Sequence, residues 1–409
     1  MKQLKPLTIT NGRLVTPQGV AVGAVRLADG MIAALGDIAP ESGDETVDAK
    51  GALIAPGIVD CGVFAIDKPA FHFGGVTRTA LMPDQVPPLD YPERAKYVAM
   101  SGKPDLWVHP LAAATRGLDG QRLSELALLR DAGARAVATG RQWIADSGVM
   151  LRVLQYAAML DMPVIAHAED AALAGESVAT AGEMASRMGL ASAPSEAEAL
   201  AVARDIALAE IAGARLHFRQ VTTRAALDLV SIAKKRGVPV TAGVTPAHFM
   251  LSDLATAEFR TFARLSPPLR SENDRQAVIE AIGEGTISII ASGHDPRGPE
   301  DKRLPFADAS PGMAGAESLL AMTLTLVRDG VIDMAHAFEL LAANPARLLG
   351  VNSGELAEGK EADIALIDPE KPWIVDSREM AATAGNTPFD GQPAQGRVTA
   401  LYKGGVHVA

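Results

Sequence analysis

Hydrophobic and polar residues follow two different patterns along this 409-residue chain. Residues 1–55 consist of short β-rich runs separated by turns, with Asn-Gly at 11–12 and Asp-Gly at 29–30. Such dipeptides between apolar runs predict β-hairpins. From about residue 354 the chain becomes β-rich again, in GELAEGKEADIALIDPE, PWIVD and RVTALYKGGVHV. The two ends therefore predict one composite module, a small β-sandwich built from residues 1–55 and 354–409.

Between these ends the pattern changes to short apolar runs that alternate with helical segments. The eight runs are PGIVDCGVF, VTRTALMP, LWVHPLAAA, ARAVAT, PVIAHAE, RLHFRQVT, VPVTAGVT and SIIASGHD. Among the helical segments, SGVMLRVLQYAAML opens with Ser147, a residue typical of helix N-caps. Eight strands alternating with helices predict an α/β fold, a parallel (β/α)8 TIM-like barrel over residues 56–353. The link after Phe64 contains Pro69 and paired glycines, so the first crossover is expected to be shortened.

Composition and charge exclude several classes of protein. Apolar residues make up 48 % of the chain and charged residues 21 %, enough for a large core. The net charge of −11 argues against binding to nucleic acid or to an anionic membrane, since both need basic patches. The single cysteine, Cys61, excludes an internal disulfide framework. The N-terminal residues lack the apolar core of a signal peptide, and no apolar run reaches about 18 residues, so a cytoplasmic protein is expected.

A series of motifs in a fixed order resembles the cyclic amidohydrolases, and most closely the dihydroorotases. The motifs are APGIVD, GGVTRTALMPDQ, PVIAHAED, VTAGVTPAHFML, SPPLR, GTISIIASGHDPRGPEDK, NPARLLG and NTPFDG. The resemblance covers essentially the whole chain. It implies one or two zinc ions at the C-terminal mouth of the barrel, which would polarise a cyclic amide and activate water. It also implies an aspartate after the eighth strand that acts as a base.

The sequence departs from the family's pattern at the positions that carry this chemistry. Two metal-binding histidines of the family correspond to Gly62 and Phe64, the bridging carboxylate or modified lysine to Thr139 or Gly140, the histidine of strand six to Gln220, and the catalytic aspartate to Gly293. The family's substrate-binding positions fall on Ile66, Asp84, Ala247 and Ser266. Among the metal and base positions, only His167 keeps its residue type.

Two acidic or imidazole side chains could still serve as ligands. We interpret His167 as a remnant of the metal site that is hydrogen-bonded inside the barrel mouth. Asp295 would reach the site if its strand slipped by two residues, and with His167 it would then form a two-ligand site. His217 lies three residues from Gln220 and is expected to point to the opposite face of its strand.

Other polar residues near the strand ends are interpreted as structural. Asp60 resembles the family's structural aspartate. Cys61 is expected to face the helices as a small hydrophobic residue. Asp67 and His72, in the short first link, are expected at the surface, and His109 in the core or at the rim.

These departures predict a chain without zinc, without another cofactor and without catalysis. The resemblance then implies a non-catalytic dihydroorotase-like protein of pyrimidine biosynthesis, an oligomer that is a structural partner of the catalytic chain of aspartate carbamoyltransferase. An active dihydroorotase or other cyclic amidohydrolase with relocated metal ligands is the alternative. A third hypothesis is a binding protein that uses the barrel mouth. The low polarity of Gly62, Phe64, Ile66 and Gly293 would then favour an apolar plug or an apolar ligand.

Overall fold

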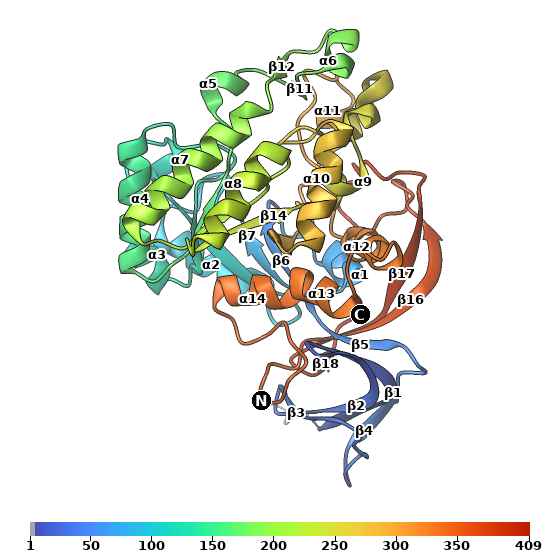
Figure 1. Ribbon diagram of the computed structural model, residues 1–409. Coiled ribbons are helices and arrows are strands. Elements are labelled where there is room, and N and C mark those ends of the chain that lie inside the picture. The colour runs from blue at the N-terminus through green and yellow to red at the C-terminus, as the bar shows by residue number, and fades with distance from the viewer. Residues whose placement is uncertain (1–4) are drawn as a thin grey trace.

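A computed structural model describes residues 5–409 as a barrel of parallel strands above a strand-rich sheet (Figure 1). The barrel strands are β6 (Ile58–Val63), β7 (Val76–Leu81), β8 (Trp107–Ala113), β9 (Ala136–Ala138), β10 (Val164–Ala166), β13 (Leu216–Phe218), β14 (Val240–Val244) and β15 (Ile287–Ile290). They pair in parallel in the order β15-β14-β13-β10-β9-β8-β7-β6. All eight predicted strands are confirmed.

The last strand is joined to the first by hydrogen bonds at their C-terminal ends. The N–H of Phe64 donates to the carbonyl of His294 at 2.8 Å. Asp60 on β6 accepts from the N–H of Ser292 at 2.9 Å and also from the Ser292 hydroxyl. Asp60 is fully buried, so the structure places it in the structural role that was expected. These contacts nearly close the barrel.

Helices cover the outside of the barrel (Figure 1). They are α1 (Lys68–Gly74), α2 (Pro92–Ser101), α3 (Leu126–Asp131), α4 (Ser147–Met159), α5 (Ala171–Ala174), α6 (Glu183–Met188), α7 (Glu196–Ala212), α8 (Arg224–Lys235), α9 (Pro246–Met250), α10 (Glu272–Gly283), α11 (Pro299–Lys302), α12 (Leu319–Arg328), α13 (Met334–Phe338) and α14 (Asn344–Leu349). Short elements between them are η1 (Arg116–Leu118), η2 (Asp253–Phe259), η3 (Thr261–Ala263), the π-helix η4 (Glu339–Ala343), and the paired strands β11 (Ala179–Thr180) and β12 (Ser192–Ala193).

Two details of the helices differ from expectation. The N-cap of α4 is Asp146, whose carboxylate accepts from the N–H of Val149 at 2.9 Å, so Ser147 is the first helical residue. The first crossover is short, yet it contains the seven-residue helix α1. Pro69 is tolerated there because it stands in the first turn, where its missing N–H would have no helical partner.

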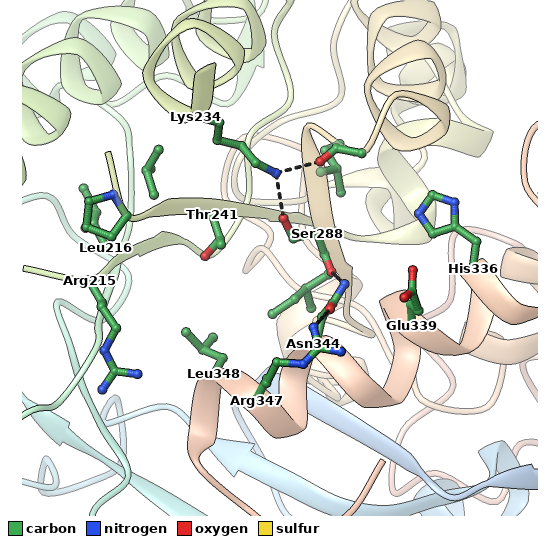
Figure 2. A pocket seen from close by; sticks show the side chains of 15 residues that line it. Arg215, Leu216, Lys234, Thr241, Ser288, His336, Glu339, Asn344, Arg347 and Leu348 are labelled. Carbon is green, nitrogen blue, oxygen red and sulfur yellow. Dashed lines mark hydrogen bonds between the residues drawn. The ribbon is translucent and has the colours of Figure 1, made fainter. Parts of the chain in front are cut away.

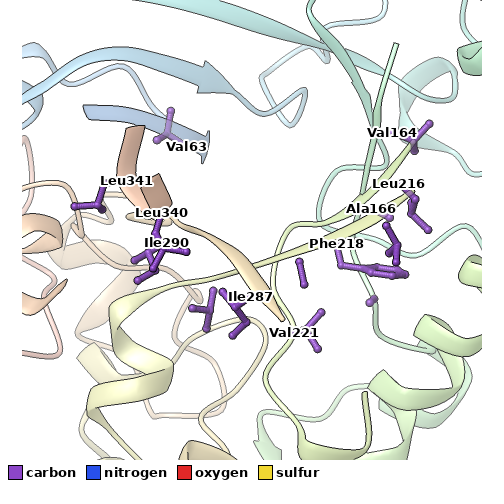
Figure 3. Close-up of a cluster of buried hydrophobic side chains, with 14 of the residues drawn as sticks. Val63, Val164, Ala166, Leu216, Phe218, Val221, Ile287, Ile290, Leu340 and Leu341 are labelled. Atoms are coloured by element: carbon purple, nitrogen blue, oxygen red, sulfur yellow. The ribbon is translucent and has the colours of Figure 1, made fainter. Parts of the chain in front are cut away.

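Two hydrophobic layers hold the barrel together. The larger lies between strands and helices, and Figure 3 shows a part of it, including Phe218, Ile290 and Leu340. The smaller fills the barrel interior with side chains such as Val59, Leu111, Ile165 and Ile289. Cys61 belongs to this inner layer, so the prediction that it faces the helices is wrong. The register of β6 against β7 shifts between Cys61 and Val63, and this bulge breaks the simple alternation of faces.

Both ends of the chain contribute to the second sheet. Its strands are β1 (Leu7–Thr16), β2 (Gly19–Ala28), β3 (Met31–Gly36), β4 (Glu45–Asp48), β5 (Leu53–Pro56), β16 (Ile364–Ile374), β17 (Pro393–Lys403) and β18 (Val406–His407). The expected β-sandwich takes the form of one sheet in the order β18-β17-β16-β5-β1-β2-β3, with β4 paired to β1. The long hairpin β16–β17 rises beside the barrel (Figure 1). The fold therefore ties the C-terminal segment to the barrel wall.

Candidate functional site at the barrel mouth

The C-terminal end of β6 carries no side chain that could bind a metal. Gly62 has a φ of +97°, and a Cβ added there would lie 3.4 Å from Cγ and Cδ of Arg219. The stem of Arg219 thus covers the place from which a ligand at position 62 would project. Phe64 is 8 % exposed and packs with the inner barrel layer.

Two guanidinium groups lie against the Phe64 ring. Cζ of Arg141 is 3.6 Å from the ring centroid, and Cζ of Arg219 is 5.1 Å from it. A cation over an aromatic face is attracted by the ring quadrupole. Burial lowers the pKa of Arg219 to about 10, and the charge of Arg141 adds to this effect, yet the group remains protonated at neutral pH. The Phe64 ring therefore lies in the mouth with two guanidinium groups beside it.

The two candidate substitute ligands are engaged with protein groups. One carboxylate oxygen of Asp295 lies 2.8 Å from Arg141 and 3.1 Å from Arg297. Nε2 of His167 lies 3.7 Å from the carboxylate of Glu169. The backbone N–H of His167 donates to the Thr139 hydroxyl at 2.9 Å. Asp295 thus lines the mouth without any slip of its strand, but it faces arginines there.

The end of β9 leaves no room for a bridging ligand. Gly140 has a φ of +82°, and a Cβ there would lie 2.8 Å from Oδ1 of Asp84. The same oxygen accepts from the N–H of Arg141 at 2.8 Å. Asp84 therefore fixes the loop that carries Arg141, and any side chain at position 140 would displace it.

The other degenerate positions complete a nearly filled mouth. A cavity of about 20 Å³ remains, lined by Phe64, Arg141, Arg219, Gln220, Thr245, His248, Leu265, Ser266, Gly293, Asp295, Gly312 and Met313. Gly293 has a φ of +60°, and a Cβ there would lie 2.9 Å from the Thr245 methyl group. Ala247 is fully buried in a neighbouring apolar cluster, and Ile66 packs against the outer layer. The mouth therefore holds little more than one water-sized particle.

The residues of the mouth do not fit a zinc ion. A catalytic zinc site normally needs three nitrogen or oxygen ligands from the protein. Among residues 5–409, no group of three or more His, Cys, Asp or Glu side chains is arranged to hold a metal ion. A divalent cation would also be repelled by Arg141 and Arg219. The absence of bound zinc itself stays a prediction.

Two further residues, Asp67 and His217, are buried and contact other protein groups. Asp67 is only 2 % exposed and accepts from the N–H of Thr383 at 2.6 Å, so its surface assignment is wrong. Its other near neighbour is His294, whose Nε2 lies 3.5 Å away. His217 is buried, and its Nδ1 lies 2.9 Å from the Thr241 hydroxyl on β14. Burial lowers the pKa of His217 to about 3, with help from the charge of Arg219.

Sequence reasoning missed the arginines, and this corrects the expectation of an apolar mouth. Arg141 and Arg219 each stand beside a position that the resemblance had singled out, Gly140 and Gln220. Their place beside those positions in the sequence is the signal that could have identified the two arginines as residues of the mouth. Nothing local to either residue indicates that it lies against Phe64, or that Arg141 also pairs with Asp295.

Another cavity, of about 560 Å³, lies at the N-terminal ends of β13, β14 and β15, away from the mouth. Figure 2 shows its lining. It is lined by Arg215, Leu216, Lys234, Pro239, Val240, Thr241, Gly285, Ile287, Ser288, Ile289, His336, Glu339, Asn344, Arg347 and Leu348. Nζ of Lys234 donates to the carbonyl of Gly285 at 2.6 Å and lies 3.2 Å from the Ser288 hydroxyl. These contacts hold the start of β15. Active sites of such barrels lie at the C-terminal face, so this cavity is not in the catalytic place.

The fold is a nearly closed barrel of parallel strands with its mouth at their C-terminal ends, and sequence comparison gives its family. The profile of the amidohydrolase family matches residues 119–408. The chain belongs to the amidohydrolase family. Its relatives place it with the dihydroorotases. It is 36 % identical over 410 residues to the dihydroorotase of Syntrophotalea carbinolica, with 96 % of each chain covered. It is 37 % identical over 416 residues to that of Pelotomaculum thermopropionicum, covering 98 % of this chain and 97 % of the relative.

Solved structures agree on the architecture. The L-hydantoinase (dihydropyrimidinase) from Arthrobacter aurescens superposes with a TM-score of 0.88 at 24 % identity, covering 99 % of this chain and 96 % of that one. The dihydropyrimidinase from Brevibacillus agri superposes with a TM-score of 0.85 at 22 % identity, covering 99 % of this chain and 95 % of that one. At these identities the likeness concerns the fold. In the described residues, no helix is both long enough and apolar enough to cross a membrane.

Proposed function

We propose that this chain is a non-catalytic member of the dihydroorotase group that acts as a structural partner of the catalytic chain of aspartate carbamoyltransferase. The observation that carries the first part is the Phe64 ring with the guanidinium groups of Arg141 and Arg219 beside it. These groups fill the mouth and make it cationic where hydrolysis would need a metal and a base. None of these three groups is a metal ligand or a base, and this supports the proposal.

The partner is proposed from the resemblance to non-catalytic dihydroorotase-like chains that associate with this transferase. The structure is compatible with such a role because the barrel and the second sheet are complete while the mouth is filled. A protein whose remaining task is to present a surface needs the fold and does not need the site.

Metal content and hydrolysis test the first part together. The chain, purified without chelators, is expected to contain far less than one zinc ion per chain by elemental analysis and to leave dihydroorotate unhydrolysed. The dihydroorotase of Syntrophotalea carbinolica, prepared identically, serves as the control. Stoichiometric zinc with hydrolysis that His167→Ala abolishes would overturn the proposal.

Co-expression tests the second part. The chain and the aspartate carbamoyltransferase catalytic chain are expected to elute as one mixed assembly, with a mass from light scattering that exceeds either alone. A stable solitary oligomer that leaves the mass and activity of the transferase unchanged would contradict the partner role.

An active cyclic amidohydrolase is the second candidate, because relatives at 36 % and 37 % identity over nearly the whole chain are named dihydroorotases. It would need His167 and Asp295 as ligands and a displacement of Arg141. The zinc measurement separates the two candidates, since only this second one requires stoichiometric metal.

A further inference from the structure

The charge of Arg219 is buried without a partner. Its side chain follows β13 into the mouth, and the residue is only 5 % exposed. Its Nε atom is buried, and no group in residues 5–409 accepts a hydrogen bond from it. A buried charge is costly unless it is paired and hydrogen-bonded. The environment of Arg219 therefore lacks a negative group in contact with it.

The nearby carboxylates are largely committed to other cations. Asp295 is shared between Arg141 and Arg297. Glu169 lies 3.6 Å from Arg270 and 3.7 Å from His167. These acids influence Arg219 only at longer range.

The charges of the mouth do not balance. Arg141, Arg219, Arg264 and Arg297 face the carboxylates of Asp84, Asp295 and Glu169. Asp84 binds the N–H of Arg141 through Oδ1, and its buried Oδ2 has no hydrogen-bond partner in the described part of the chain. Lys302 adds a further cation, and it lies close enough to feel the charges of Asp295, Arg264, Arg297 and Asp301. Of these groups, Arg141, Arg219 and Asp295 line the residual cavity itself, so its lining carries two positive charges and one negative charge.

The residual cavity of about 20 Å³ lies between these groups and offers donors. Arg219, Arg141, Gln220 and Ser266 line it, and their guanidinium, amide and hydroxyl groups can donate hydrogen bonds. His248 lines it too but is occupied: its Nε2 lies 3.1 Å from the carbonyl of Pro267 and its Nδ1 2.9 Å from the Thr245 hydroxyl. The volume admits one particle of about the size of water.

We propose that the barrel mouth binds one small monovalent anion of about the size of chloride, held against the guanidinium of Arg219. The anion neutralises the charge that the protein leaves unpaired, at the place where related hydrolases would need cations. This inference goes beyond the proposed function, because it concerns the isolated chain and does not require the transferase.

Bromide is the probe. Crystals grown in sodium bromide are expected to show one anomalous peak beside Arg219. In solution, replacing sodium gluconate by sodium bromide at constant ionic strength should raise the melting temperature along a saturable curve. Arg219→Met keeps an apolar side chain and removes the charge, so bromide should no longer raise the melting temperature. Arg236→Met, which breaks an exposed pair with Glu210, is the matched control and should keep it.

A second variant covers the case in which Arg219→Met does not fold. Asp84→Asn keeps an oxygen for the N–H of Arg141 and removes a competing negative charge, so half-saturation should need about fivefold less bromide. Any one of three results would overturn the inference. They are no bromine peak beside Arg219, the same rise of melting temperature with bromide in Arg219→Met as in the unmodified chain, and an unchanged half-saturation in Asp84→Asn.

Discussion

At the scale of single residues, the ring of Phe64 is the feature on which the mouth depends. It packs on the inner barrel layer and lies beside two guanidinium groups. Phe64→Ala would leave a cavity and remove both cation–ring contacts. We expect a loss of about 3–5 kcal/mol in the free energy of unfolding, measured by urea denaturation.

A matched aromatic substitution tests whether this loss depends on the site. Tyr97 on α2 is 76 % exposed, so Tyr97→Ala should change the urea midpoint little. Equal losses for the two variants would show that Phe64 does not hold the mouth together.

At the scale of elements, a buried ionic network joins the barrel to the second sheet. Asp363, just before β16, accepts from Nε of Arg78 on β7 at 2.7 Å and from Nζ of Lys403 on β17 at 2.8 Å. It also accepts from the Ser353 hydroxyl at 2.9 Å. Asp363→Ala would leave the buried cations of Arg78 and Lys403 with only the less buried Glu361 as a carboxylate partner. We expect a loss of about 3–5 kcal/mol in the free energy of unfolding, measured by urea denaturation.

The control for this network is an exposed ion pair. Arg378 has a side chain that is 85 % exposed, and it pairs with Asp376 at 2.6 Å. Surface pairs contribute little, so Asp376→Asn should leave the urea midpoint nearly unchanged. A loss from Asp363→Ala as small as that from Asp376→Asn would mean that the network does not couple the two parts.

The elements also show what could be predicted from the sequence. Barrel strands are buried on both faces and read as continuous apolar runs, so all eight were identifiable. The bulge that turns Cys61 inward was not, because it arises from pairing with β7. The arginine cluster was missed for the same kind of reason: Arg141 and Asp295 are 154 residues apart. Burial of Asp67 likewise depends on Thr383, at the far end of the chain.

At the scale of the whole molecule, buried histidines make the free energy of unfolding depend on pH. His109, His217 and His248 lie in three different parts of the barrel, and burial lowers the pKa of each to about 3. In the unfolded chain each would have a pKa of about 6.5. All three are therefore neutral when folded and charged when unfolded in mild acid. Their contribution is fully present above about pH 6.5 and is lost as the pH falls toward 3.

The expected result is a steep fall in stability below pH 6.5. Each histidine contributes up to about 1.4 kcal/mol per pH unit, and urea midpoints between pH 7.5 and 5 would reveal the summed slope before most carboxylates titrate. His217→Asn should be less stable at pH 7.5. Its free energy of unfolding should fall less steeply with decreasing pH, because one proton fewer is taken up on unfolding. His407→Asn, on the exposed strand β18, should keep the original slope. A flat profile from pH 7.5 to 5 in the unmodified chain would mean that these imidazoles accept protons without unfolding, and hence that the barrel around them admits water.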